Sequence, residues 1–254
     1  MTKAVLTALV TGGARRIGRA ISLDLAEHGF AVAIHCNRSR GEAAALKAEI
    51  EAGGGRAAVV EADLTDRAAL AGVVAAAAGA LGPVGLLVNN ASIFEDDSIL
   101  DFGWEVWDRH FAVHLEAPAL LSRAFAEGLR SGHEGLIVNI IDQRVGKLTP
   151  RHLSYTLSKS ALWTLTQTMA QALAPAIRVN AIGPGPTLPN SRQGPRDFEA
   201  QQEALILKRG PALPEFGRTI RYLWEARSVT GQLIALDGGQ HLAWETPDVT
   251  GIGE

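Results

Sequence analysis

The chain has 254 residues, of which 47% are hydrophobic and 20% are charged, and its formal net charge is -3. This composition excludes a disordered or fibrous chain, and the slightly acidic balance excludes a broad nucleic-acid-binding surface. The lone Cys36 supplies neither an internal disulfide nor a cysteine-based metal site. We therefore expect a cytoplasmic protein that binds no nucleic acid and no metal.

Short apolar runs alternate with helical stretches along the chain. We predict strands at 5–10, 31–36, 57–61, 85–89, 135–141, 177–182 and 232–236, and helices at 15–28, 40–52, 66–80, 104–131 and 152–174. Unbroken apolar runs separated by helices are typical of parallel strands buried on both faces. The predicted fold is a single doubly wound α/β domain over 1–254, with a seven-stranded parallel sheet flanked by helices.

Two segments deviate from this alternation. Residues 68–88 carry no charge, but the turn signal Gly82-Pro83 divides them into a helix, a break and a strand, so we predict no membrane span. Residues 183–214 are rich in glycine and proline, with a short helix expected near 198–208. A long loop in a compact domain usually covers a binding site, so we predict a substrate loop near 186–214.

A glycine-rich turn, Thr11 to Gly18, follows the first strand and leads into a helix. Such a backbone turns tightly and lets a pyrophosphate approach the amides at the helix N-terminus. At the first strand-to-helix junction of a βαβ series, the turn predicts a dinucleotide-binding site. A purely structural turn is the alternative.

The second strand is followed by a stretch with no acidic residue before Glu42. A site specific for NAD usually places a carboxylate here to accept the ribose 2′-hydroxyl. The guanidinium of Arg38 and the hydroxyl of Ser39 instead suit a 2′-phosphate, so NADP(H) is the predicted cofactor. The alternative is that Arg38 and Arg40 are only solvated loop charges.

Tyr155 and Lys159 share one face of a predicted helix, because they are four residues apart. Two unit charges about 4 Å apart, at an effective dielectric constant of about 20, interact by roughly 4 kcal/mol. The ammonium is therefore expected to lower the pKa of the phenol by at most about 3 units, which makes Tyr155 a usable acid or base. A surface ion or hydrogen-bond pair is the alternative.

In chain order, five motifs resemble the short-chain dehydrogenase/reductase family over nearly the whole sequence: the Thr11 to Gly18 turn, Asp63-Leu64, Asn89-Asn90-Ala91, Tyr155 with Lys159, and Ile177 to Asn180 leading into Pro184-Gly185. The resemblance implies a Rossmann domain, Tyr155 as proton donor, and Lys159 as the residue that binds the nicotinamide ribose and lowers the pKa of the tyrosine. By analogy it also implies a homotetramer. The implied cofactor residues are Gly12, Arg15, Arg16, Ile17, Gly18, His35, Asn37, Arg38, Ser39, Asp63, Leu64, Asn89, Ala91, Ser92, Tyr155, Lys159, Pro184, Gly185, Thr187 and Leu188.

Departures from the common family pattern narrow the resemblance. Arg16 stands where most members have glycine, and Asp142 where most have serine. Together with His35 to Ser39 and Asn89 to Phe94, they are similar to the pteridine reductase branch, which includes bacterial dihydromonapterin and dihydrofolate reductases. That branch implies NADPH-dependent reduction of dihydromonapterin, dihydrobiopterin or dihydrofolate. The implied substrate residues are Arg16, Ser92, Phe94, Asp142 and Tyr155, with Phe94 stacking on the ring opposite the nicotinamide.

The carboxyl group of Asp142 is suited to the reduction of a pterin C=N bond. Reduction of a C=N bond requires hydride at carbon and a proton at the adjacent nitrogen, and a carboxyl in a dry pocket has a raised pKa that suits a general acid. Asp142 is therefore predicted to supply or relay that proton together with Tyr155. The alternative is a structural carboxylate that caps the loop at Gln143-Arg144 or pairs with Arg144.

Two other functions stay open at this point. One is reduction of a ketone or 3-oxoacyl substrate, with Asp142 as an idiosyncrasy of this chain. The other is a cofactor-binding module without chemistry, which is suggested by His114 at the place where the family commonly has asparagine. His114 is predicted either to maintain a proton relay or to be a buried histidine with its hydrogen bonds satisfied.

Overall fold

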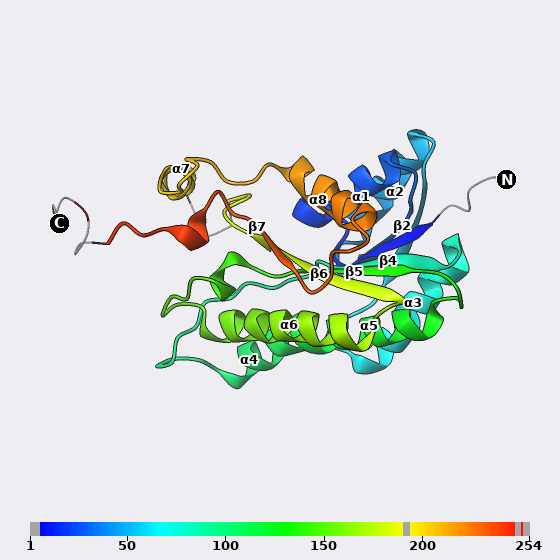
Figure 1. Cartoon of the computed structure of the whole chain (residues 1–254), viewed down its shortest axis with the longest axis horizontal. Coiled ribbons are helices and arrows are strands. Elements are labelled where there is room, and N and C mark those ends of the chain that lie inside the picture. The colour runs from blue at the N-terminus through cyan, green and yellow to red at the C-terminus, as the bar shows by residue number, and fades with distance from the viewer. Residues whose placement is uncertain (1–5, 190–193, 247–249, 251–254) are drawn as a thin grey trace.

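The computed structural model describes residues 6–189, 194–246 and 250. Seven parallel strands form one sheet in the order β3-β2-β1-β4-β5-β6-β7 (Figure 1). They are β1 (Thr7–Val10), β2 (Ala31–Cys36), β3 (Arg56–Glu61), β4 (Val84–Asn89), β5 (Gly135–Ile140), β6 (Ile177–Pro184) and β7 (Leu233–Leu236). All seven predicted strands are present, and the predicted Rossmann-type α/β fold is confirmed.

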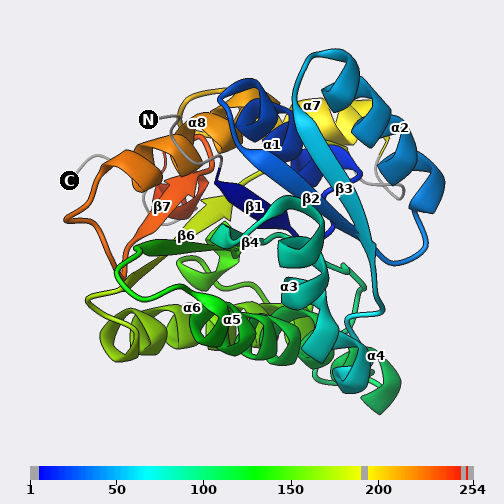
Figure 2. The same ribbon diagram turned by 90° about the vertical axis from the view of Figure 1, so that its right-hand side faces the viewer.

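Helices cover both faces of the sheet. They are α1 (Arg16–Glu27), α2 (Arg40–Ala52), α3 (Arg67–Leu81), α4 (Trp104–Phe111), α5 (Ala117–Gly128), α6 (Leu153–Ala172), α7 (Pro195–Glu203) and α8 (Leu213–Glu225). Figure 2 shows α1, α2 and α8 on one side of the sheet and α3, α5 and α6 on the other. Each layer buries its own apolar cluster, because side chains of a strand alternate between the two faces.

The break in the uncharged stretch falls where the sequence predicts it. Helix α3 ends at Leu81, and Gly82 takes a φ of +101° that L-residues rarely adopt. Strand β4 begins at Val84. Among the described residues, no helix has the length and apolar character needed to span a membrane.

Two predictions about helices are wrong. The expected continuous helix over 104–131 is interrupted by a π-helical turn at Ala112–Glu116. Pro118 explains the interruption, because it has no N–H to donate to the carbonyl of His114 four residues earlier. Helix α8 was not predicted at all, although Phe216, Ile220 and Leu223 are buried at helical spacing.

The sheet order reverses between β1 and β4, which are neighbours although two strands separate them along the chain. The connections after these two strands leave the sheet toward opposite faces. In open α/β sheets a crevice forms at this point, outside the carboxyl ends of the strands. The glycine-rich turn after β1 and the segment after β4 border this crevice.

Candidate active site

The glycine-rich turn closes so tightly that only glycine fits at two of its positions. Gly12 has a φ of +59°, and a Cβ atom on Gly18 would lie 2.1 Å from the carbonyl oxygen of Gly12. Asn90 holds the turn by donating from Nδ2 to the carbonyl of Thr11 at 2.9 Å. Helix α1 starts directly after the turn, at Arg16. The free amides of a helix N-terminus bind anions, so the turn suits a phosphate.

His35 supports this turn from beneath. The backbone N–H of Gly12 donates to its Nδ1 at 3.2 Å, and its Nε2 lies 3.2 Å from the carbonyl oxygen of Ala62. Because an amide N–H only donates, Nδ1 is the acceptor and Nε2 carries the proton. Burial of the ring lowers the pKa of His35 to about 4. The structure thus places this predicted cofactor residue behind the turn, with both ring nitrogens bonded to the protein.

The residues predicted to bind the adenosine end gather where β2 and β3 end. Asp63 accepts hydrogen bonds from the N–H and hydroxyl of Thr65, at 2.9 and 2.8 Å, and these bonds lower its pKa. Asn37 and the charge of Arg38 act on Asp63 in the same direction. The cap of helix α3 is Asp66, which accepts from the N–H of Ala68, so Asp63 does not cap that helix.

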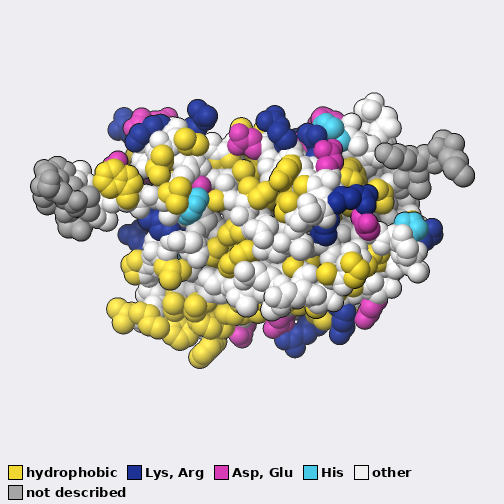
Figure 3. All heavy atoms as spheres, viewed as in Figure 1, with side chains coloured by type: hydrophobic (Ala, Val, Ile, Leu, Met, Phe, Trp, Pro, Cys, Tyr) yellow, Lys and Arg dark blue, Asp and Glu magenta, His cyan; other side chains and the backbone are white. Residues whose placement is uncertain are grey.

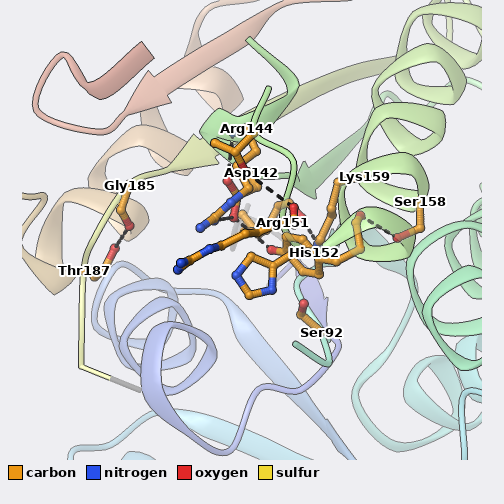
Figure 4. A network of polar contacts seen from close by, with 12 residues as sticks. Ser92, Asp142, Arg144, Arg151, His152, Ser158, Lys159, Gly185 and Thr187 are labelled. Carbon is orange, nitrogen blue, oxygen red and sulfur yellow. Dashed lines mark hydrogen bonds and ion pairs between the residues drawn. The ribbon is translucent and has the colours of Figure 1, made fainter. Parts of the chain in front are cut away.

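The three predicted catalytic side chains meet in a cleft of about 690 Å³. The hydroxyl of Tyr155 donates to Oδ2 of Asp142 at 2.9 Å. Lys159, which is 2% exposed, donates from Nζ to the carbonyl of Ile140 at 2.8 Å and lies 5.8 Å from the centre of the tyrosine ring. In Figure 4, Asp142 lies between Lys159 on α6 and the segment from Gly185 to Thr187.

The pKa of Tyr155 moves in the direction opposite to the sequence-based prediction. Burial of the phenol raises its pKa well above the ordinary value, and the negative charge of Asp142 raises it further. Burial also lowers the pKa of Lys159 to about 8, and its ammonium donates to a backbone carbonyl. Tyr155 therefore holds its proton in this structure.

Asp142 caps its loop and lies beside Arg144, as the structural alternative predicts, and it also contacts Tyr155. Its Oδ1 accepts from the backbone N–H of Arg144 at 2.8 Å, so it caps the short helical turn Gln143–Val145. Its Oδ2 accepts from Tyr155 and lies 3.4 Å from Nη1 of Arg144. The carboxylate is thus held by the loop while it contacts the reactive phenol.

Two stacked histidines support the tyrosine from α4 and the π-helical turn. The ring centres of His110 and His114 are 5.4 Å apart, and each lies edge-on to Tyr155. Each Nε2 accepts a backbone N–H, and each Nδ1 lies within 2.9 Å of a serine hydroxyl of α6, Ser154 for His110 and Ser158 for His114. His114 is therefore a buried, neutral histidine with both nitrogens satisfied. Burial lowers the pKa of His114 well below its usual value, and that of His110 to about 4.

Phe94, which the resemblance implies as a substrate residue, lies beside Tyr155. Its ring is edge-on to Tyr155, with centres 4.8 Å apart, and tilted against His152 at 4.4 Å. The guanidinium carbon of Arg144 lies 5.4 Å from the centre of the same ring. A flat ligand in the cleft thus has an aromatic wall next to Tyr155.

Arg16 closes the cleft at its outer side. Its guanidinium donates to the carbonyls of Leu188 and Pro189 at 3.3 and 3.1 Å, which ties the N-terminus of α1 to the predicted substrate loop. Asn89 turns its side chain into the sheet, where it donates to Oδ1 of Asn139 at 2.8 Å. The lining residues that the sequence singled out are Arg15, Arg16, Ile17, Ser92, Phe94, Asp142, Tyr155, Lys159, Pro184, Gly185, Thr187 and Leu188.

Several lining residues were missed as functional candidates: Asn90, Ile140, Ile141, Gln143, Arg144, Pro186, Gln201 and Gln240. Gln201 and Gln240 come from α7 and from the turn after β7, far along the chain from the catalytic motifs. Gln201 falls within the substrate loop predicted near 186–214, although the residue itself was not singled out. No local pattern marks Gln240, since only the folding of the chain brings it to the cleft. Arg144 is different, because it stands two residues from Asp142 and was considered only as its ion-pair partner.

Comparisons with known proteins agree with this geometry. A family model described as short chain dehydrogenase matches residues 6–200. The chain belongs to this family. It is 34% identical over 246 residues to L-rhamnose 1-dehydrogenase (NAD(P)(+)) of a Sphingomonas species, covering 93% of this chain and 96% of that protein. It is 29% identical over 241 residues to 3-oxoacyl-[acyl-carrier-protein] reductase FabG of Staphylococcus epidermidis, with coverage of 93% and 99%.

A solved structure is more similar. The crystal structure of FolM alternative dihydrofolate reductase 1 from Brucella canis, complexed with NADP, is 60% identical in sequence. It superposes with a TM-score of 0.95 and covers 97% of this chain and 98% of that one.

Proposed function

We propose that the protein is an NADPH-dependent oxidoreductase that reduces the C=N bond of a dihydropterin. The observation that carries the proposal is the 2.9 Å hydrogen bond from Tyr155 to Asp142 in the cleft. Reduction of a carbonyl and reduction of a C=N bond both take hydride at carbon and a proton at the heteroatom, but a carbonyl oxygen is commonly polarised by a neutral donor, whereas Asp142 brings a carboxylate to the phenol. A protonated phenol that is bonded to a carboxylate suits the second reaction. The similarity to a dihydrofolate reductase complexed with NADP supports the same assignment.

The cradle at the glycine-rich turn fits a dinucleotide. The closure of the turn around Gly12 leaves no room for a side chain at Gly18, and Arg15, Arg16 and Ile17 of the helix N-terminus line the cleft. Arg38 and Ser39 would bind a 2′-phosphate, since Arg40 is already paired with Glu61. When bound, the cofactor supplies the hydride.

The proton comes from the protein. Tyr155 holds its proton at neutral pH, because burial and the Asp142 carboxylate raise its pKa. The hydroxyl gives this proton to the ring nitrogen, which leaves a phenolate behind. Asp142 lines the open cleft, so it is the group through which Tyr155 regains a proton from solvent.

The test is a steady-state assay of NADPH oxidation with dihydropterins and with ketones. The wild type is expected to turn over a dihydropterin, and Asp142→Ser to lose about 100-fold or more of that activity, as expected for loss of a general acid–base group. NADPH binding is the control and should be unchanged. Absence of NADPH oxidation with any pterin, together with good turnover of ketones, would refute the proposal.

The second candidate is reduction of a ketone or 3-oxoacyl substrate. It is favoured by the 29% identity to a 3-oxoacyl reductase. In this case Asp142→Ser restores the residue that is common in the family, and carbonyl turnover should be retained or improved. A collapse of carbonyl turnover in the variant would count against this candidate.

We further propose that the protein is a cytoplasmic homotetramer. Figure 3 shows apolar side chains gathered near α4, where Ile99, Leu100 and Trp104 are 70%, 93% and 67% exposed. Contiguous exposed apolar surface is typical of an interface, because association removes it from water. Light scattering coupled to size exclusion should give four times 26.9 kDa. A monomeric mass would contradict this.

A further inference from the structure

Arg144 occupies the cleft between the two groups that define the site. Its Nη1 lies 3.4 Å from Oδ2 of Asp142, and its guanidinium carbon lies 5.4 Å from the ring centre of Phe94. The side chain is 22% exposed, and its Nε is buried without a hydrogen-bond partner. This arginine is therefore mostly buried while one of its donors is unused.

An unused buried donor is unfavourable, because the N–H group has lost its water and gained no acceptor. Guanidinium carries only donors, and the carboxylate of Asp142 carries only acceptors. Arg144 and Asp142 both line the cleft, so a side chain with donors and a side chain with acceptors lie side by side, next to the aromatic wall of Phe94. The matching ligand is a flat ring that carries an oxygen acceptor beside the position that receives a proton.

The 4-oxo pteridine ring has this arrangement. The nitrogen at ring position 5 takes the proton when the C=N bond between it and the carbon at position 6 is reduced. The carbonyl oxygen at position 4 is its peri neighbour, on the same side of the bicyclic ring. With that nitrogen at Tyr155 and Asp142, the carbonyl oxygen points toward the neighbouring side chain, which is Arg144.

We propose that Arg144 is a specificity-determining residue, whose Nε–H binds the 4-carbonyl oxygen of the pteridine ring. This inference rests on the proposed pterin function and adds to it a preference for 4-oxo rings. The guanidinium carbon lies over the ring of Phe94, and this cation–π contact holds the donor at the aromatic wall. Arg144 thereby recognises the substrate without taking part in proton transfer.

The test compares two ligands that differ at the 4-carbonyl group and at the lactam N3–H that accompanies it. Binding of pterin and of 2-aminopteridine, which lacks the 4-carbonyl group, is measured by calorimetry on enzyme saturated with NADP⁺, so that no turnover occurs. The wild type should bind pterin about 10-fold or more tightly, the range expected for one hydrogen bond to a charged donor. In Arg144→Met this preference should fall below about twofold, while NADP⁺ affinity is retained.

Two further variants make the result specific. Arg144→Lys keeps a positive charge beside Asp142 but removes the buried Nε–H, so it should lose the preference as well. Arg227→Met removes an arginine that is ion-paired with Glu134 and does not line the cleft, and it should keep the wild-type preference. Equal binding of the two rings by the wild type, or full preference in either Arg144 variant, overturns the inference.

The outcomes separate this inference from the proposed function. Dihydropterin turnover without a preference for the 4-oxo ring refutes only the role of Arg144. Failure to reduce any dihydropterin refutes the proposed function, whatever the two rings show in the binding experiment.

Discussion

The buried ring of His110 makes the native state sensitive to acid. The side chain is 0% exposed, and burial lowers its pKa from an ordinary value near 6.5 to about 4. The charges that act on the ring are Asp97, which raises its pKa, and Arg109, Lys159 and His152, which lower it. Below pH 6.5 the unfolded chain takes up a proton that the native state does not bind, so stability falls as the pH falls.

The size of this effect follows from the two pKa values. Between pH 7.5 and pH 5.0, a histidine with a pKa of about 6.5 unfolded and about 4 folded lowers the free energy of unfolding by about 2 kcal/mol. His35 has the same folded pKa and adds a similar amount. The loss from each continues to about pH 4, where the folded state also binds the proton.

Urea unfolding at the two pH values measures this difference, with fluorescence of the five tryptophans as the signal. His110→Asn should be less stable at pH 7.5, and its loss between pH 7.5 and 5.0 should be about 2 kcal/mol smaller than that of the wild type. The matched control is His133→Asn, at an exposed position, which should lose as much as the wild type. If His110→Asn shows the full wild-type loss, the assignment of the acid sensitivity to this ring is refuted.

Three further substitutions test the fold and the cofactor site. Gly18→Ala places a methyl group 2.1 Å from the Gly12 carbonyl, so NADPH binding by fluorescence titration should be lost, and unchanged affinity would contradict the tight turn. Arg38→Gln should weaken NADPH binding by about 10-fold or more and leave NADH binding unchanged; equal weakening of both would place Arg38 away from the 2′-phosphate. Arg178 donates to the carbonyls of Leu223, Trp224, Ala226 and Val229. Arg178→Met should therefore lower the free energy of unfolding, measured in urea, by about 3 kcal/mol. A change below about 0.5 kcal/mol would show that water replaces these hydrogen bonds.

Helix α8 has a helical pattern that can be recognised in the sequence. Phe216, Ile220 and Leu223 have helical spacing, and proline at the start of the segment is compatible with a first helical turn. The segment follows a stretch rich in glycine and proline, which masked the pattern. The π-helical turn at Ala112–Glu116, unlike helix α8, could not be predicted from the sequence. A proline in a helical pattern indicates that the helix is distorted, but it does not specify the form of the distortion.

In the candidate active site, too, some features could be predicted from the sequence and others could not. Tyr155 and Lys159 could be paired from their spacing alone, because a helix brings residues i and i+4 together. The direction in which the pKa of Tyr155 shifts could not be predicted, since it depends on burial and on the carboxylate of Asp142 from another element. Arg144 was visible in the sequence, but its position over Phe94 depends on how the loop after β5 folds against the segment after β4.

The sequence by itself determined the seven strands, their parallel arrangement and the glycine-rich turn, because these follow from local apolar runs and from backbone conformations that only glycine adopts. It also predicted which residues carry the chemistry. The tertiary structure decided which groups touch: Asp142 on Tyr155, two histidines beneath the phenol, and Arg144 against Phe94. Burial and electrostatic fields sum over residues that are distant in the chain, so the protonation state of the site and its unused donor emerge only when the chain is folded.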